Sequence, residues 1–203
     1  MAIIIFIRHG RALTNEKGIM NSDIEGFPLV QTGILETQKV AKELDKVHVS
    51  ALYCSPMLRS RQTADIIGEA VNLNPRIDDR LREREAGEMR NMPAADGDWL
   101  LDVDWKTSKV ETMASMLERA RSFINSISAV NGIYVAVTHD SIIKSVFMNI
   151  YNMDDTMENA LKNRNSSMSI MATRKGWTPL AMNYVKITDP LLAKISEMLL
   201  LVL

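Results

Sequence analysis

Two of the chain's three histidines follow short apolar segments of similar character. His9 comes after the segment 3–7, and His139 comes after the segment 132–138. A neutral imidazole is a nucleophile near neutral pH and can also donate a hydrogen bond to an anion. The third histidine, His48, lies between a predicted helix and a predicted strand, and we interpret it as structural. The repeated setting of the other two makes them candidates for one site.

Arginines also occur near the ends of predicted strands. Arg8 directly precedes the first of these histidines, and Arg59 and Arg61 lie about one helical turn beyond the predicted strand 48–55. An arginine at a helix start opposes the helix dipole unless an anion lies between them. We therefore expect Arg59, which is nearer the strand end, to bind an anion, whereas Arg61 is either a second anion ligand or a solvated surface residue.

A carboxylate joins this set at Glu83. It belongs to the charged run 81–91, and such runs are usually solvated faces of a protein. However, it follows the predicted strand 76–81 by two residues, so it would reach the same sheet edge as the histidines.

Two imidazoles, two guanidinium groups and one carboxyl group suit phosphoryl transfer. Guanidinium groups neutralise a phosphoryl group through bidentate hydrogen bonds. A neutral imidazole can attack phosphorus and form a phosphohistidine, and a carboxylic acid with a raised pKa can protonate the leaving alkoxide. This set requires no metal. A dinucleotide-binding domain is excluded, because no glycine-rich loop follows the first strand.

These residues must be positioned by alternating strands and helices. Apolar runs bounded by turn residues predict strands over 2–8, 48–55, 76–81 and 132–139, with a closing hairpin of 166–174 and 177–185 around Lys175-Gly176. Helical periodicity predicts helices over 32–47 with Thr32 as N-cap, 57–71, 110–128, 141–151 and from Asp189 onwards. The alternation indicates an α/β fold, a three-layer αβα sandwich with a mostly parallel sheet. In such folds ligands bind at the carboxyl ends of the strands.

The chain of 203 residues is long enough for one domain, and we expect residues 1–203 to form it. The segment 11–32 has a loop composition. The segment 86–109, with Met92, Trp99 and Trp105, is expected to be a lid or small helical insertion. The apolar stretch 190–203 is expected to pack on its own domain, with a homodimer contact as the alternative.

Composition limits the partners. The formal net charge is −1, so no overall field attracts the chain to nucleic acid or to an anionic membrane. The single cysteine, Cys54, is expected to be buried in a strand, and its being alone fits a reducing compartment. With no signal-peptide pattern and no apolar run of membrane-spanning length, the prediction is a cytoplasmic protein.

Four blocks of the sequence together resemble a known family. They are "RHG" at 8–10 with Asn15, "SPMLRSRQTA" at 55–64, "LREREAG" at 81–87 and "VTHD" at 137–140. In this order and spacing they are similar to the histidine phosphatase superfamily, in its phosphoglycerate-mutase-like branch. The resemblance implies that family's phosphoglycerate-mutase-like fold and a small phosphorylated metabolite as ligand.

The resemblance also implies roles for individual residues. His9 corresponds to the nucleophile, Glu83 to the general acid and base, and His139 to the second histidine that hydrogen-bonds the phosphoryl oxygens. The implied phosphate-binding residues are Arg8, Gly10, Asn15, Arg59 and His139, and the implied catalytic residues are His9, Glu83, His139, Arg8 and Arg59.

Some positions depart from the family pattern. Ala12 replaces a common Thr or Ser, Asp140 replaces a common Gly or Ala, and Glu85 and Ala86 replace the His-Tyr pair of the mutases. The long insertion that the mutases place after the glycine of this block is also reduced here. The missing pair and the reduced insertion favour a phosphatase that needs no cofactor. The alternatives are a 2,3-bisphosphoglycerate-dependent phosphoglycerate mutase, which alone would use 2,3-bisphosphoglycerate as a primer, and a non-catalytic module that binds a phosphorylated ligand. Specificity would depend on 11–32 and 86–109.

Overall fold

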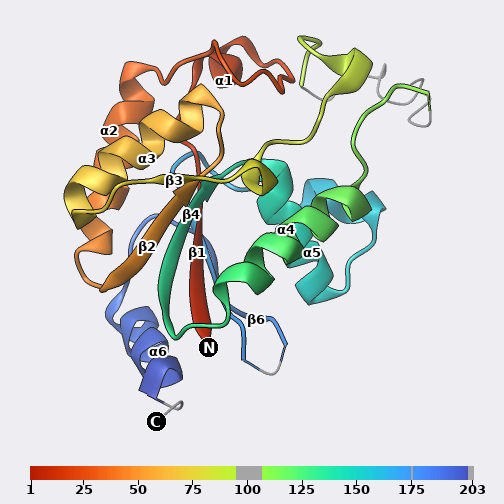
Figure 1. The fold of residues 1–203 in the computed structure, drawn as a ribbon. Coiled ribbons are helices and arrows are strands. Elements are labelled where there is room, and N and C mark those ends of the chain that lie inside the picture. Colours follow the sequence, from red (N-terminus) through yellow and green to blue (C-terminus); the bar gives the residue numbers. More distant parts are fainter. Residues whose placement is uncertain (95–106, 175, 201–203) are drawn as a thin grey trace.

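A mixed, mostly parallel sheet forms the centre of the molecule in a computed structural model that describes residues 1–94, 107–174 and 176–200 (Figure 1). In the described residues the sheet has six strands in the order β3-β2-β4-β1-β5-β6. The strands are β1 (Ala2–Arg8), β2 (Val49–Cys54), β3 (Arg76–Ile77), β4 (Gly132–Thr138), β5 (Met168–Ala172) and β6 (Thr178–Tyr184). Among the described strands, β5 runs opposite to the other five and pairs antiparallel with both β1 and β6.

Helices cover both faces of the sheet. The α-helices are α1 (Leu13–Lys17), α2 (Gln31–Leu44), α3 (Leu58–Val71), α4 (Met113–Ile127), α5 (Asp140–Tyr151) and α6 (Asp189–Leu200), and the 3₁₀ turns are η1 (Asp79–Leu81), η2 (Gly87–Met89) and η4 (Asp155–Ala160). Because side chains alternate along a strand, β1 supplies both cores. Ile3, Ile5 and Ile7 pack with α2, α3 and α6, whereas Ile4 and Phe6 pack with α4 and α5. The predicted three-layer αβα sandwich is confirmed.

Three predicted elements differ in detail. Helix α2 begins at Gln31 rather than after a Thr32 cap, because tertiary contact fixes its start: a Cβ atom on Gly33 would lie 2.1 Å from the Arg11 carbonyl oxygen. The segment 11–32, predicted as loop, contains the short helix α1. The predicted strand 76–81 is a two-residue strand followed by the 3₁₀ turn η1, so Glu83 is reached through a turn.

The C-terminal helix packs on its own domain as predicted. Leu191 and Ile195 of α6 are buried in the core shared with α2 and α3. Cys54 is buried in β2, also as predicted. Within the described residues no helix is long and apolar enough to cross a membrane. Trp99 and Trp105 lie outside the described residues, and the lid and the homodimer stay predictions.

Candidate active site

The register of two parallel strands brings the two histidines together. Arg8 at the end of β1 is paired with Thr138 at the end of β4, so His9 and His139 leave the sheet side by side. Their ring centroids are 5.1 Å apart, and both rings are buried. The predicted meeting of these residues at the carboxyl edge is confirmed.

The hydrogen bonds of His9 fix its tautomer. Nδ1 lies 2.8 Å from the Gly10 carbonyl oxygen, which can only accept, so Nδ1 carries the proton. Arg59 Nε donates to His9 Nε2 over 3.2 Å, which marks Nε2 as the nitrogen with the lone pair. Burial, then the charges of Arg59 and Arg8, lower the pKa of His9 well below its ordinary value. The ring is therefore neutral near pH 7, with its unprotonated nitrogen facing a guanidinium group.

Arg59 is held in the first turn of α3 and is almost completely buried. Its Nη2 donates to the Asn21 carbonyl oxygen over 3.1 Å, whereas its Nη1 is buried without a hydrogen-bond partner among the described residues. Burial lowers the pKa of Arg59, and the nearby charge of Glu83 opposes this shift. Arg61, by contrast, forms an ion pair with the exposed Glu25, which favours the surface interpretation of this residue over an anion ligand.

His139 depends on a residue that the sequence interpretation did not single out. Its Nε2 lies 2.8 Å from Ser55 Oγ, and that oxygen also accepts a hydrogen bond from the Met57 backbone N–H. When the Ser55 hydroxyl donates to Nε2, the imidazole proton is on Nδ1, a buried atom with no partner among the described residues. Burial and the charge of Arg59 lower the pKa of His139 well below its ordinary value. The sequence feature that could have identified Ser55 as a site residue is its position directly after the second strand.

Gly10 and Arg8 flank His9 in different ways. A Cβ atom on Gly10 would lie 2.5 Å from Thr37 Oγ1, so the close packing of α2 requires glycine there. Its N–H donates to Thr63 Oγ1 over 2.9 Å. The Arg8 guanidinium group is anchored at one nitrogen: Nη1 donates to the Asn163 carbonyl oxygen, whereas Nε is buried without a partner among the described residues.

Asn15 lies at the start of α1. Its Oδ1 accepts from the Ala12 N–H over 3.0 Å and from Asn165 Nδ2 over 3.2 Å. Asn165 Nδ2 also lies 3.1 Å from the His9 carbonyl oxygen. Asn165, which sequence reasoning missed, thus ties Asn15 to the backbone of the candidate nucleophile.

The segment that carries Glu83 is held by side chains from α4 and the residues before it. Arg119 donates to the carbonyl oxygens of Arg82 over 2.6 Å and Glu83 over 3.2 Å, and it pairs with Glu111 over 2.7 Å. Burial raises the pKa of the Glu111 carboxyl, but Arg119 outweighs it and the pKa lies below its ordinary value. The Glu83 carboxylate itself accepts from the backbone N–H of Arg84 over 2.8 Å and is only partly buried.

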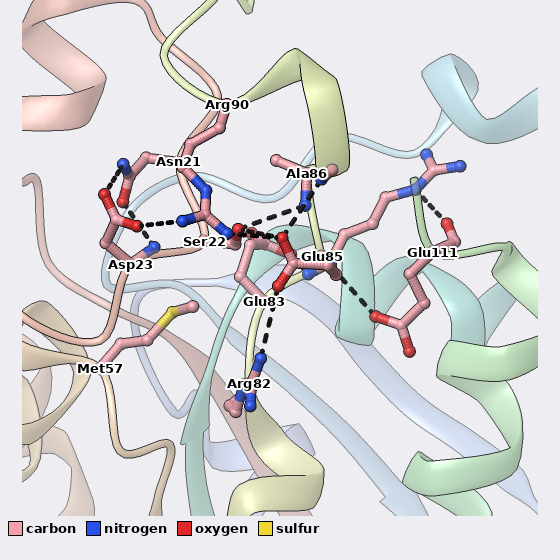
Figure 2. A network of polar contacts seen from close by, with 12 residues as sticks. Asn21, Ser22, Asp23, Met57, Arg82, Glu83, Glu85, Ala86, Arg90 and Glu111 are labelled. Atoms are coloured by element: carbon pink, nitrogen blue, oxygen red, sulfur yellow. Dashed lines mark hydrogen bonds and ion pairs between the residues drawn. The ribbon is translucent and has the colours of Figure 1, made fainter. Parts of the chain in front are cut away.

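Next to this carboxylate, Glu85 joins two loops. Figure 2 shows its carboxylate between Ser22 and the side chains of Arg82 and Arg90. Burial raises the pKa of the Glu85 carboxyl, but hydrogen bonds from Ser22 and Arg90 outweigh it, so the pKa is lowered overall. Arg90 also pairs with Asp23 over 2.9 Å. Glu85, one of the departures from the mutase pattern, therefore connects 82–90 to the loop 21–23.

Three buried nitrogens of this cluster have no hydrogen-bond partner among the described residues: Arg8 Nε, Arg59 Nη1 and His139 Nδ1. Leaving a buried donor unsatisfied is costly, and such atoms in a native structure call for an explanation. An oxyanion that accepts from these nitrogens would supply it. Within the described residues, no group of three or more His, Cys, Asp or Glu side chains is placed to hold a metal ion.

Comparisons with known proteins agree with this arrangement. The family model described as "Histidine phosphatase superfamily (branch 1)" matches residues 4–184. The 2,3-bisphosphoglycerate-dependent phosphoglycerate mutase of Thermoplasma acidophilum is 28% identical over 93% of this chain and 96% of its own length. A mycobacterial glucosyl-3-phosphoglycerate phosphatase, solved with VO3, has a TM-score of 0.77 at 22% identity and covers 89% of this chain and 98% of its own. A phosphoserine phosphatase from Entamoeba histolytica, solved with phosphoserine, has a TM-score of 0.77 at 21% identity and covers 91% and 98%. The two solved structures, at these identities, support the fold.

Proposed function

The chain belongs to the histidine phosphatase superfamily, branch 1, and from that premise we propose that it is a phosphomonoester hydrolase with His9 as nucleophile and Glu83 as general acid and base. Members of this family are enzymes, and reaction through a phosphohistidine is typical of them. A non-catalytic binding module is therefore disfavoured, and His9, Glu83, His139, Arg8 and Arg59 are all present.

The observation that carries the proposal is the setting of His9 Nε2. The imidazole is buried and neutral, its proton is held on Nδ1 by Gly10, and Arg59 lies at hydrogen-bond distance from the lone pair. A buried neutral nucleophile beside a buried cation is the arrangement that attack on a phosphate dianion requires, because the cation offsets the charge of the incoming group.

In the first step, Nε2 attacks phosphorus, the P–N bond forms and the ester P–O bond breaks. The Arg59 N–H that faces Nε2 turns to donate to one phosphoryl oxygen. Arg8 and His139 Nδ1 donate to the other phosphoryl oxygens. The Glu83 carboxyl donates its proton to the leaving alkoxide.

In the second step, water attacks the phosphohistidine. The Glu83 carboxylate takes a proton from that water, the P–N bond breaks and inorganic phosphate leaves with the new P–O bond. His9 returns to its neutral form, and no cofactor is consumed in this proposed cycle.

The proposed ligand is a small phosphorylated metabolite. The unpartnered nitrogens of Arg8, Arg59 and His139 support this, since each can donate to an oxyanion. The phosphoserine bound by the Entamoeba histolytica relative supports the same class of ligand. Asn15 and Gly10 complete the proposed pocket through the backbone around His9.

A mutase is the second candidate, and one observation favours it. One relative that this chain matches along nearly its whole length is a 2,3-bisphosphoglycerate-dependent phosphoglycerate mutase. Both activities share the first step, but a mutase returns the phosphoryl group to the substrate instead of to water. Only in that case would 2,3-bisphosphoglycerate act as a primer.

A panel of phosphomonoesters that includes 3-phosphoglycerate, assayed with and without 2,3-bisphosphoglycerate, tests the two candidates. Release of inorganic phosphate without the bisphosphate supports the hydrolase. Formation of 2-phosphoglycerate that depends on the bisphosphate supports the mutase and overturns our first choice.

A further inference from the structure

A large cavity opens beside the histidine pair without including it. Its volume is about 950 Å³, and it lies between α2, the start of α5, residues 162–166 and residues 185–186. Arg8 lines it, whereas His9, His139, Arg59 and Glu83 do not.

The charges around this cavity are unbalanced. Eight lysine and arginine side chains line it against three carboxylates, a formal surplus of 8 − 3 = 5 positive charges in a chain whose total is −1. Two of the carboxylates are already engaged: Glu43 with Lys46, and Asp140 with Lys144. Like charges gathered in this way repel one another and focus a positive potential into the concavity.

Several of the cations form no ion pair with the described part of the chain. Lys39, Lys42 and Lys162 come from two separate segments and form no ion pair within the described residues. Arg8 also lines the cavity, but its unpartnered Nε is assigned to the phosphoryl site, so the lysines carry the case for a second site. Lysine ammonium groups act as point charges that suit phosphate groups in many geometries.

From this arrangement we propose that the cavity is a second anion site, separate from the histidine pair, that binds a compact non-aromatic polyanion carrying two or more phosphate groups. The volume falls in the range of small-molecule sites. No aromatic side chain lines the cavity in the described residues, so it offers no ring on which a nucleobase could stack.

The walls of the two sites are connected. Arg8 Nη1 donates to the backbone of Asn163, which lines the cavity, and Asn165, also in its wall, donates to the His9 carbonyl oxygen. A polyanion in the cavity contacts residues that flank the candidate nucleophile, but it leaves His9 Nε2 free.

Calorimetric titration of the purified full chain with tripolyphosphate, in the presence and absence of saturating orthovanadate, tests the proposal. Vanadate mimics phosphate and occupies the phosphoryl site. Binding of tripolyphosphate that persists under saturating vanadate is the expected result. Complete loss of that binding would place the polyanion at the histidine pair and overturn a separate site. This readout needs no turnover, so it is independent of whether the chain is a phosphatase.

Charge reversals locate the binding. Lys39→Glu combined with Lys162→Glu is expected to weaken tripolyphosphate binding by at least about tenfold. The matched control Lys194→Glu, on the exposed side of α6, is expected to change it by less than about twofold because of screening. Equal weakening by Lys162→Glu and Lys194→Glu would overturn the assignment to this cavity. ATP binding more than about tenfold tighter than tripolyphosphate would overturn the non-aromatic class.

Discussion

The two ends of the candidate site are held in different ways. The imidazole end, which consists of His9, Arg59 and His139, is fixed by backbone: two adjacent parallel strands end in register, and the first turn of α3 follows a third. Its side chains are buried, and its hydrogen bonds run mainly to main-chain atoms and to Ser55.

The carboxylate end, which consists of Glu83 and Glu85, follows a strand of only two residues and a 3₁₀ turn. Side chains hold it in place, chiefly Arg119 and Glu111 on one side and Ser22 on the other. Figure 2 shows Glu111 and Ser22 on either side of Glu85. The side chains of Glu83 and Glu85 are only partly buried. A sheet edge positions the nucleophile with little freedom, whereas a side-chain network can change from one relative to another. We therefore infer that the proton transfer and substrate choice of this enzyme depend more on the carboxylate end.

The largest effect is expected from removing the nucleophile. His9→Ala should lower kcat by at least about 10⁴-fold, because the nitrogen on which the covalent intermediate forms is removed. Acid-labile phosphate should be trapped on the wild type and not on the variant, and far-UV circular dichroism should show that the fold persists. His48→Ala, at an exposed histidine, is the matched control. Full activity in His9→Ala would end the proposal.

The second effect tests the electrostatics of the same end. Arg59→Gln should reduce kcat/KM by about 10²–10³-fold, because a buried cation at the reacting atoms is lost. Burial, Arg59 and Arg8 lower the pKa of His9 below its ordinary value of 6.5. The imidazole therefore stays neutral at pH values below 6.5, and the acid limb of the kcat/KM profile of the wild type lies below that pH. Loss of Arg59 removes one cause of that shift, and the limb should move to higher pH.

Arg61→Gln is the matched control for this substitution, since Arg61 is one half-turn away on the same helix and pairs with exposed Glu25. It should retain wild-type kcat/KM and an unshifted acid limb. If both variants behaved alike, the cationic role would belong to the helix surface rather than to the buried guanidinium group.

The contrast between the imidazole end and the carboxylate end also explains what could be predicted from the sequence. The imidazole end was predictable because two apolar segments each end in a histidine, and parallel strands bring their carboxyl ends together. Arg119 and Glu111 were not, because their partners lie about 30 residues upstream in irregular backbone and no local periodicity links them. Ser55 and Asn165 were missed for a related reason: a hydroxyl or amide that orients another side chain leaves no pattern of its own.

A third prediction concerns the acid. Glu83→Gln should slow the hydrolysis of alkyl phosphates by about 10²-fold, because their leaving groups need a proton. Hydrolysis of p-nitrophenyl phosphate should slow by only a few-fold. Steady-state kinetics on the two substrates measures the difference. Glu88→Gln, in the 3₁₀ turn η2, is the control and should affect neither. Equal losses on both substrates would remove Glu83 from the proton transfer.

The smallest effect should come from the network behind that acid. Arg119→Lys keeps the charge, but it cannot reproduce the forked hydrogen bonds to the carbonyl oxygens of Arg82 and Glu83 and to Glu111. We expect kcat on alkyl phosphates to fall by about tenfold with KM little changed, while p-nitrophenyl phosphate, which needs no acid, is cleaved at nearly the wild-type rate. Glu118→Gln, beside Arg119 on α4, is the control. A general loss of structure would slow the hydrolysis of both substrates and would lower the melting temperature. Selective loss of activity on alkyl phosphates therefore identifies a positioning role for Arg119. Parallel loss on both substrates refutes that role. The selective result would also show that the carboxylate end can be adjusted without disturbing the nucleophile.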